Sequence, residues 1–189
     1  MSCVALQLGG LRGCRLQFQF ARNQPACTDA SGISLEVGQG FMTSRTGGAL
    51  QDALLRLMRA IAAGEDSVVS ALLAASPALA TARVVGGATR QGPKRFYLDA
   101  IGHYLYADET PLHVAAAAYQ AAIARKLIQM GADVRARNRL GAEPLHYAVI
   151  GMPGSRAWNP AAQAATVAYL IEAGADPNAI DKHANGQWS

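Results

Sequence analysis

The sequence lacks the features of several protein classes. No apolar run reaches the roughly 18 residues that a membrane-spanning helix needs, so we expect no membrane segment. The three cysteines, Cys3, Cys14 and Cys27, fit neither a C-x-x-C zinc pattern nor an even set of disulfide bonds. This cysteine usage favours a reducing compartment, and we expect an intracellular, cytoplasmic location.

Signatures of catalysis and cofactor binding are also absent from the sequence. It shows no nucleophile constellation, no phosphate-cradling glycine loop and no paired carboxylate site. Gly86 and Gly87 form a turn signal only, because no Gly-Lys-Ser or Gly-x-Gly-x-x-Gly context surrounds them. We therefore expect no enzyme, no metal and no cofactor, and an active site assembled from scattered residues remains the alternative.

Lysine is scarce, with three residues against 14 arginines, and the net charge is +4. Residues 1–106 carry the basic excess, with ten basic and six acidic side chains, whereas residues 107–189 carry seven of each. This excess is too small for the dense basic face of a nucleic-acid-binding domain. Nucleic-acid binding through residues 1–46 and 78–106 is therefore the less favoured alternative.

The chain does contain an internal repeat with a period of 33 residues. Residues 110–115, with the sequence TPLHVA, return as residues 143–148, with the sequence EPLHYA. A Gly-Ala-Asp segment follows each, starting at Gly131 and at Gly174. The second Gly-Ala-Asp segment lies about ten residues further along its unit than the first does. Residues 151–160, rich in glycine and proline, interrupt that second unit and account for the difference. In both units, the apolar residues between the Pro-Leu-His motif and the Gly-Ala-Asp segment have the spacing of one face of a helix.

A 33-residue period with a T-P-L-H-x-A core resembles the ankyrin repeat, a turn followed by two antiparallel helices. The resemblance covers residues 47–183 and implies an all-α, helix-turn-helix solenoid of about three units. It also implies a structural role for the residues of the motif. These are Thr110, Pro111, Leu112, His113, Gly131, Pro144, Leu145, His146 and Gly174.

The pattern divides the chain into six segments. They are a flexible leader (1–46), an N-terminal capping helix pair (47–77), an inserted loop (78–106), a repeat (107–139), a repeat with an inserted inter-helix loop (140–183) and a tail (184–189). In the capping pair, we expect Gly64 to turn the chain between helices and Asp66 to cap the second helix.

The motif departs from the family at several places. Tyr119 and Gln120 stand where Gly-His normally turns the chain, which leaves that turn geometry open. Glu143 replaces the motif threonine and removes a hydroxyl that helps to hold the turn. In ankyrin proteins the motif histidine resembles a structural group that hydrogen-bonds within and between turns. For His113 and His146 we favour this role over metal binding or general-base chemistry.

The resemblance implies a protein-protein interaction module. It would bind a partner protein through the exposed segments that join successive helix pairs, called fingers, and through positions on the first, or inner, helix of each pair. Arg135, Arg137 and Arg139 alternate along one finger and would point the same way in an extended backbone. This edge suits an acidic partner, and a solvated finger is the alternative. The other positions on the candidate face are Glu109, Val114, Leu140, Ala142 and Tyr147.

The two insertions extend the candidate surface. Residues 78–106 are basic and aromatic, and aromatic side chains bury much area at little entropy cost. The candidate partner anchors in this segment are Lys94, Arg95, Phe96, Tyr97, Tyr104 and Tyr106. In the second insertion, Trp158 either anchors a partner or covers the helices beneath it, and covering is favoured.

The end of the chain begins a further repeat that does not continue. Residues 181–183, Asp-Lys-His, match the start of a repeat, but the expected Thr-Pro-Leu-His is replaced by residues 184–189, ANGQWS. The apolar flank of the last helices then lacks a covering repeat. We expect an exposed hydrophobic flank that favours self-association.

Overall fold

A computed structural model describes residues 43–90, 92–151 and 158–182 of the chain. Most of the expected leader (1–46) and all of the expected tail (184–189) lie outside the described residues. The first helix, α1, spans Thr43–Ala63 and so begins within the segment that we expected to be leader. Past Thr43, every described element belongs to one unit, Ser44–Ser189.

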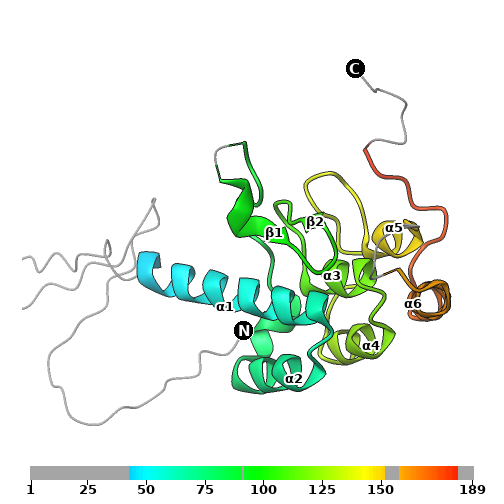
Figure 1. Cartoon of the computed structure of the whole chain (residues 1–189), viewed down its shortest axis with the longest axis horizontal. Coiled ribbons are helices and arrows are strands. Elements are labelled where there is room, and N and C mark those ends of the chain that lie inside the picture. The colour runs from blue at the N-terminus through cyan, green and yellow to red at the C-terminus, as the bar shows by residue number, and fades with distance from the viewer. Residues whose placement is uncertain (1–42, 91, 152–157, 183–189) are drawn as a thin grey trace, which may run out of the picture. The chain divides into compact units, whose positions relative to one another are not determined.

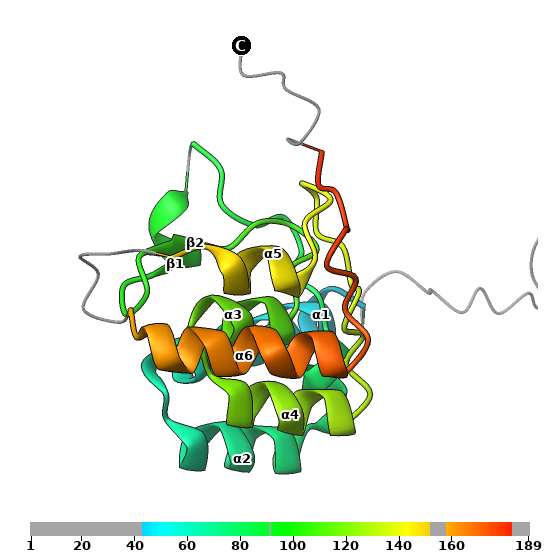
Figure 2. The ribbon, with the colours of Figure 1, turned by 90° about the vertical axis from the view of Figure 1, so that its right-hand side faces the viewer.

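Three helix pairs form the frame of the described part. α1 is followed by α2 (Asp66–Ala75), α3 (Pro111–Ala117) by α4 (Ala121–Gln129), and α5 (Pro144–Val149) by α6 (Pro160–Glu172). Figures 1 and 2 show α1, α3 and α5 in one layer and α2, α4 and α6 in the other. Because α3 packs against α5, and α4 against α6, the second pair covers the third, and Lys126 of α4 bonds to Asp66 of α2 in the first pair. The expected helical solenoid is confirmed.

One hydrophobic core runs through the stack. Leu57 and Ile61 of α1, Leu112 of α3, Leu127 of α4 and Leu170 of α6 are fully buried and belong to one cluster. Full burial of such a side chain contributes about 1.5–3 kcal/mol relative to exposure. Since this cluster draws on several helix pairs, each pair depends on its neighbours for stability.

The helix pairs are joined by turns of two kinds. Gly64 ends α1 with a φ of 72°, as expected, because only glycine adopts this conformation at no steric cost. Tyr119 adopts a φ of 56° between α3 and α4, and its hydroxyl donates to the carbonyl of Ile150. The predicted cap at Asp66 is wrong. Glu65 is the N-cap residue, and the Asp66 carboxylate instead accepts from Lys126 Nζ of α4 at 2.9 Å.

The insertion, residues 78–106, has regular structure of its own. It follows the first residue of η1 (Pro77–Thr81) and contains η2 (Pro93–Phe96), β1 (Tyr97–Leu98) and β2 (His103–Tyr104). The two strands pair antiparallel, with Tyr97 opposite Tyr104. Leu98, Ile101 and Leu105 are buried in the same core cluster as the helices. The insertion is therefore a folded part of the unit rather than a surface loop.

Candidate protein-interaction surface

The insertion lies across the layer formed by α1, α3 and α5. At one end, the Arg95 guanidinium pairs with Asp52 of α1 at 2.6 Å, and Arg59 of α1 donates to the Arg95 carbonyl at 2.8 Å. At the other end, the His103 ring contacts Tyr147 of α5 edge to face, with centroids 5.1 Å apart. Figure 2 shows the strands above α3 and beside α5. The insertion thus spans the inner helices from the first pair to the third.

This placement corrects part of the predicted binding face. Glu109 and Val114 are fully buried, and Ala142 is buried as well, so none of the three can contact a partner. Val114 belongs to the core cluster that also contains Leu98 and Leu105 of the insertion. Val114 was predicted to be exposed because the sequence does not show where the insertion lies.

A buried polar network holds the insertion to the repeats. Glu109 Oε1 accepts from the Tyr147 hydroxyl at 2.6 Å and from Asn138 Nδ2 at 3.3 Å, while Oε2 lies 3.1 Å from His103 Nε2. These partners come from α5, the finger before it and β2. Burial and the negative charge of Glu109 raise the pKa of Tyr147, which keeps its hydroxyl a donor. The network explains the fully buried carboxylate without a catalytic role.

The finger between α4 and α5 carries the three predicted arginines. All three are exposed, but their charges are partly compensated. Arg137 Nε donates to Glu143 Oε1 at 3.1 Å, and Arg135 Nη2 lies 3.2 Å from Asp176 Oδ2. The Arg139 guanidinium instead lies 5.7 Å from the centre of the Tyr106 ring. Arg139 is therefore the member of the row that contacts an aromatic ring rather than a carboxylate.

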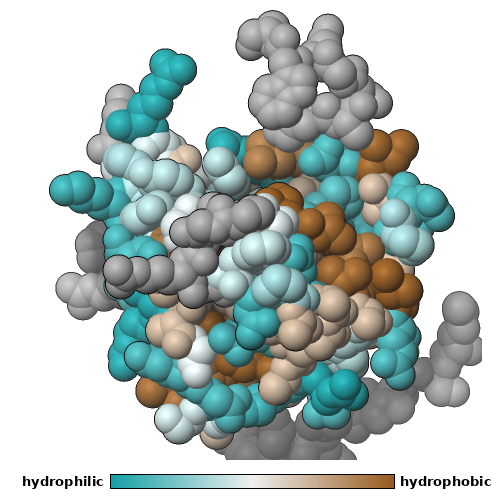
Figure 3. Space-filling view, turned by 45° about the vertical axis from the view of Figure 1, so that its right-hand side comes forward, coloured by the Kyte–Doolittle hydropathy of each residue, from teal (hydrophilic) through white to brown (hydrophobic). Residues whose placement is uncertain are grey.

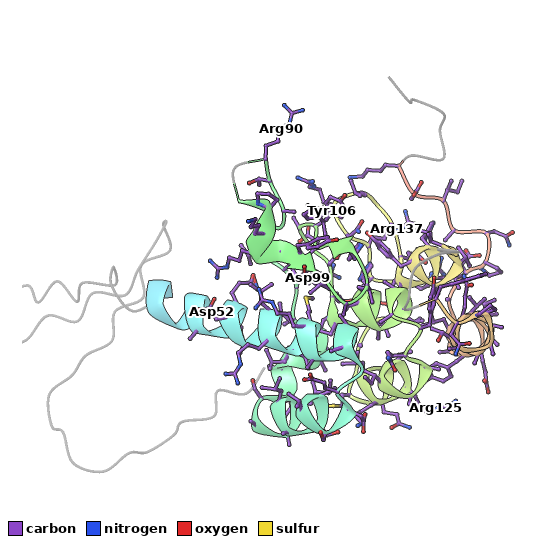
Figure 4. The ribbon with its side chains drawn as sticks, in the orientation of Figure 1. Asp52, Arg90, Asp99, Tyr106, Arg125 and Arg137 are labelled. Carbon is purple, nitrogen blue, oxygen red and sulfur yellow. The ribbon has the colours of Figure 1, made fainter. Side chains whose placement is uncertain are left out.

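An open groove separates this finger from the one that follows α6. It has a volume of about 640 Å³ and is lined by Arg137, Asn138, Gly141, Ile180, Asp181 and Lys182. Lys182 Nζ donates to the Arg139 carbonyl at 2.9 Å and so fixes the edge of the groove. Figure 4 shows Tyr106 and Arg137 on this finger side, and Arg125 on the side of the outer helices. The groove was not predicted, because sequence spacing does not show which finger residues face each other.

The candidate anchors of the insertions differ in exposure. Lys94, Arg95 and Tyr104 are exposed, whereas Phe96, Tyr97 and Tyr106 are half-buried. Trp158, in the second insertion, is half-buried, and its Nε1 donates to Gln163 Oε1 at 2.9 Å. Gln163 in turn donates to the Ala148 carbonyl at 3.0 Å, which links Trp158 to α5. These contacts favour covering over partner binding for Trp158.

The motif histidines make structural hydrogen bonds. His113 Nδ1 accepts from the Thr110 N–H at 3.2 Å, and its Nε2 donates to the carbonyl of Ala142 in the next finger at 3.1 Å. His146 Nδ1 accepts from the Glu143 N–H at 3.0 Å in the same way. The turn at Glu143 therefore keeps its histidine bond although the hydroxyl is lost.

In residues 43–90, 92–151 and 158–182, no group of three or more His, Cys, Asp or Glu side chains is placed to hold a metal ion. No helix in these ranges combines the length and the apolar character that crossing a bilayer requires.

Comparisons with known proteins agree with the stacked pairs. The family model described as ankyrin repeats, in three copies, matches residues 57–181. A search of curated proteins finds no match. The matched range is more than half of the chain, and it begins in α1 and ends in the finger after α6. The chain belongs to the ankyrin repeat family.

Proposed function

We propose that this chain is an interaction module that binds a partner protein along one continuous surface, the finger edge. We define the finger edge as Tyr104, Tyr106, Arg137, Arg139, Ile180 and Lys182. Ankyrin repeats are in general protein-protein interaction modules. The proposal depends on the position of the insertion. Because the insertion covers the inner helices, the side chains of the finger edge are the accessible ones beside it.

The chemistry of the finger edge favours an acidic segment of the partner. Glu143 holds Arg137 through its Nε, and Tyr106 lies beneath Arg139, so both guanidinium groups are ordered before binding. Preordered side chains lose less entropy when they bind. A guanidinium group can bind a carboxylate through two parallel hydrogen bonds. Ile180, 60% exposed, adds an apolar contact at the same groove.

The alternatives are less well supported. Arg95 and Arg135, which lie outside the finger edge, are paired with carboxylates of the chain itself, which lowers the positive potential that nucleic acid would require over a wider surface. An enzyme would need a reactive group at an accessible site, whereas the Glu109 carboxylate is buried and fully engaged by donors. The cytoplasmic location stays a prediction.

The first test is a charge reversal at Arg139. After a partner is captured from the native cell and purified, we expect Arg139→Glu to weaken its binding about tenfold, equivalent to about 1.4 kcal/mol. The reversal places a like charge opposite the acidic segment. Binding is measured by titration calorimetry, and the wild-type affinity should also fall as salt is raised.

Arg125→Glu is the matched control for this reversal. Arg125 lies on the outer-helix side, with its guanidinium over the Tyr169 ring at 4.2 Å. We expect this control to leave the affinity unchanged, with the helical circular dichroism of both variants retained. Equal losses in the two variants, or no loss at Arg139, would count against the finger edge as the binding surface.

A further inference from the structure

The side chains of the finger edge form three pairs, one on each of three segments: the insertion, the finger between α4 and α5, and the finger after α6. The pairs are Tyr104 with Tyr106, Arg137 with Arg139, and Ile180 with Lys182. The residue between the two members points inward each time, because Leu105 and Asn138 are buried and Asp181 is half-buried. Alternate residues of an extended segment point to the same side, so the two members of each pair face outward together.

The three pairs are in register along the stack. The Arg139 N–H donates to the Ala107 carbonyl at 3.0 Å, and the Lys182 N–H donates to the Leu140 carbonyl at 3.0 Å. Because these two bonds are equivalent, Tyr106, Arg139 and Lys182 hold equivalent positions. Side-chain contacts agree, since the Arg139 guanidinium lies 5.7 Å from the centre of the Tyr106 ring, and Lys182 Nζ donates to the Arg139 carbonyl at 2.9 Å. A partner that crosses the stack therefore meets an aromatic pair, then a guanidinium pair, then an isoleucine beside a lysine.

The step between successive pairs sets the spacing that a partner segment needs. Packed helices lie about 8–10 Å apart, and each segment is displaced from the previous one by the same step. A polyproline II helix has about three residues per turn and rises about 3.1 Å per residue, so every third side chain lies on one face, about 9 Å from the last. Such a segment places its side chains i, i+3 and i+6 on the three successive pairs.

We propose that the finger edge binds a polyproline II-like segment with an apolar side chain at i, a carboxylate at i+3 and an apolar side chain at i+6. This inference rests on the proposed function and names the segment that the surface recognises. The members of a pair lie about 7 Å apart along an extended backbone, so one carboxylate fits between Arg137 and Arg139. Tyr104, 43% exposed, and Ile180, 60% exposed, provide the apolar contacts on either side. Asp181 also lines the groove beside Ile180, and no acidic group of the partner is assigned to that finger.

Apolar side chains are also exposed on the last helix pair, where we expected a flank that favours self-association. Val149 is 56% exposed, Ile150 53% and Ile171 42%. Figure 3 shows hydrophobic side chains gathered on the side where α5 and α6 lie. Self-association through this face stays a prediction. Because Ile171 is an exposed isoleucine outside the finger edge, it serves as the matched control for Ile180.

A change of specificity at Ile180 tests the proposed spacing. The probes are two fluorescein-labelled peptides with a neutral, proline-rich background, leucine at i and glutamate at i+3, and they differ in carrying leucine or glutamate at i+6. The full-length wild type is expected to prefer the leucine peptide. We expect Ile180→Arg to shift the ratio of the two affinities about tenfold toward the glutamate peptide, equivalent to about 1.4 kcal/mol. Fluorescence anisotropy measures both affinities, circular dichroism confirms that each variant stays folded, and Ile171→Arg should keep the wild-type ratio.

The outcomes separate this inference from the proposed function. If Ile180→Arg keeps the wild-type ratio, or if Ile171→Arg shifts it equally, the spacing is wrong. The finger edge then still stands as the surface for an acidic segment, provided that Arg139→Glu weakens peptide binding. If neither peptide binds, or if Arg139→Glu leaves the binding unchanged, both the finger edge and the spacing are wrong. Moving the second leucine from i+6 to i+4 is expected to weaken binding to the wild type, and equal binding would contradict the polyproline II geometry.

Discussion

Replacing Leu112 with alanine is expected to lower the free energy of unfolding by about 2–5 kcal/mol. Leu112 is fully buried in α3, the inner helix of the middle pair. Because α3 packs against α4, α5 and η1, the cavity opens where three neighbours meet. Side chains cannot collapse into such a site without moving whole helices, which places the cost toward the upper part of this range. Urea unfolding followed by circular dichroism measures it.

Two matched variants control for the loss of a leucine side chain. Leu50 of α1 is 44% exposed, so Leu50→Ala is expected to change the free energy of unfolding by about 0.5 kcal/mol or less. Leu145→Ala, in the last pair, should fall between the two because fewer elements surround it. If Leu112→Ala costs no more than Leu50→Ala, the pairs do not share a core.

Acid is expected to remove about 3 kcal/mol of stability through His113 alone. Burial lowers the pKa of His113 from 6.5 to about 4. The ring is neutral in the fold, because Nδ1 accepts from the Thr110 N–H while Nε2 donates to the Ala142 carbonyl. A second ring proton, on Nδ1, would break the bond that Nδ1 accepts from the Thr110 N–H.

The sign of this dependence follows from the lowered pKa. As the pH falls below 6.5, His113 becomes protonated in the unfolded chain but stays neutral in the folded chain. The contribution of His113 is therefore complete above pH 6.5, is lost between pH 6.5 and about 4, and does not fall further below that range.

His113→Gln isolates this contribution from that of other titrating groups. The free energy of unfolding is measured for both proteins across this pH range, and the wild type is expected to lose more than the variant. Parallel pH profiles for the two proteins would show that His113 is not the group responsible.

The repeated helices could be predicted because their signals are local. The motif around Leu112 and Leu145, the glycine turn at Gly64 and the helical spacing of apolar residues all act within one helix pair. A cap at Asp66 was also predicted from local rules, and it failed because Lys126, 60 residues away, pairs with that carboxylate. Tertiary partners of this kind have no signature in the local sequence.

The position of the insertion could not be predicted from its composition. Its basic and aromatic residues suggested a solvent-facing anchor, whereas Leu98, Ile101 and Leu105 form its buried side. The spacing of these apolar residues was the available signal. No signal in the sequence indicated the burial of Glu109, because its hydrogen-bond partners come from β2, a finger and α5, which meet only in the fold.

Amide hydrogen exchange tests most directly whether the insertion is part of the repeat core. The N–H of Ala88 donates to the Leu105 carbonyl at 2.7 Å, and the N–H of Leu105 to the Phe96 carbonyl at 2.8 Å. We predict that both amides exchange with the same opening free energy as the Ala118 amide at the end of α3. Exchange of Ala88 and Leu105 at the rate of an unfolded peptide, while Ala118 stays protected, would contradict the account.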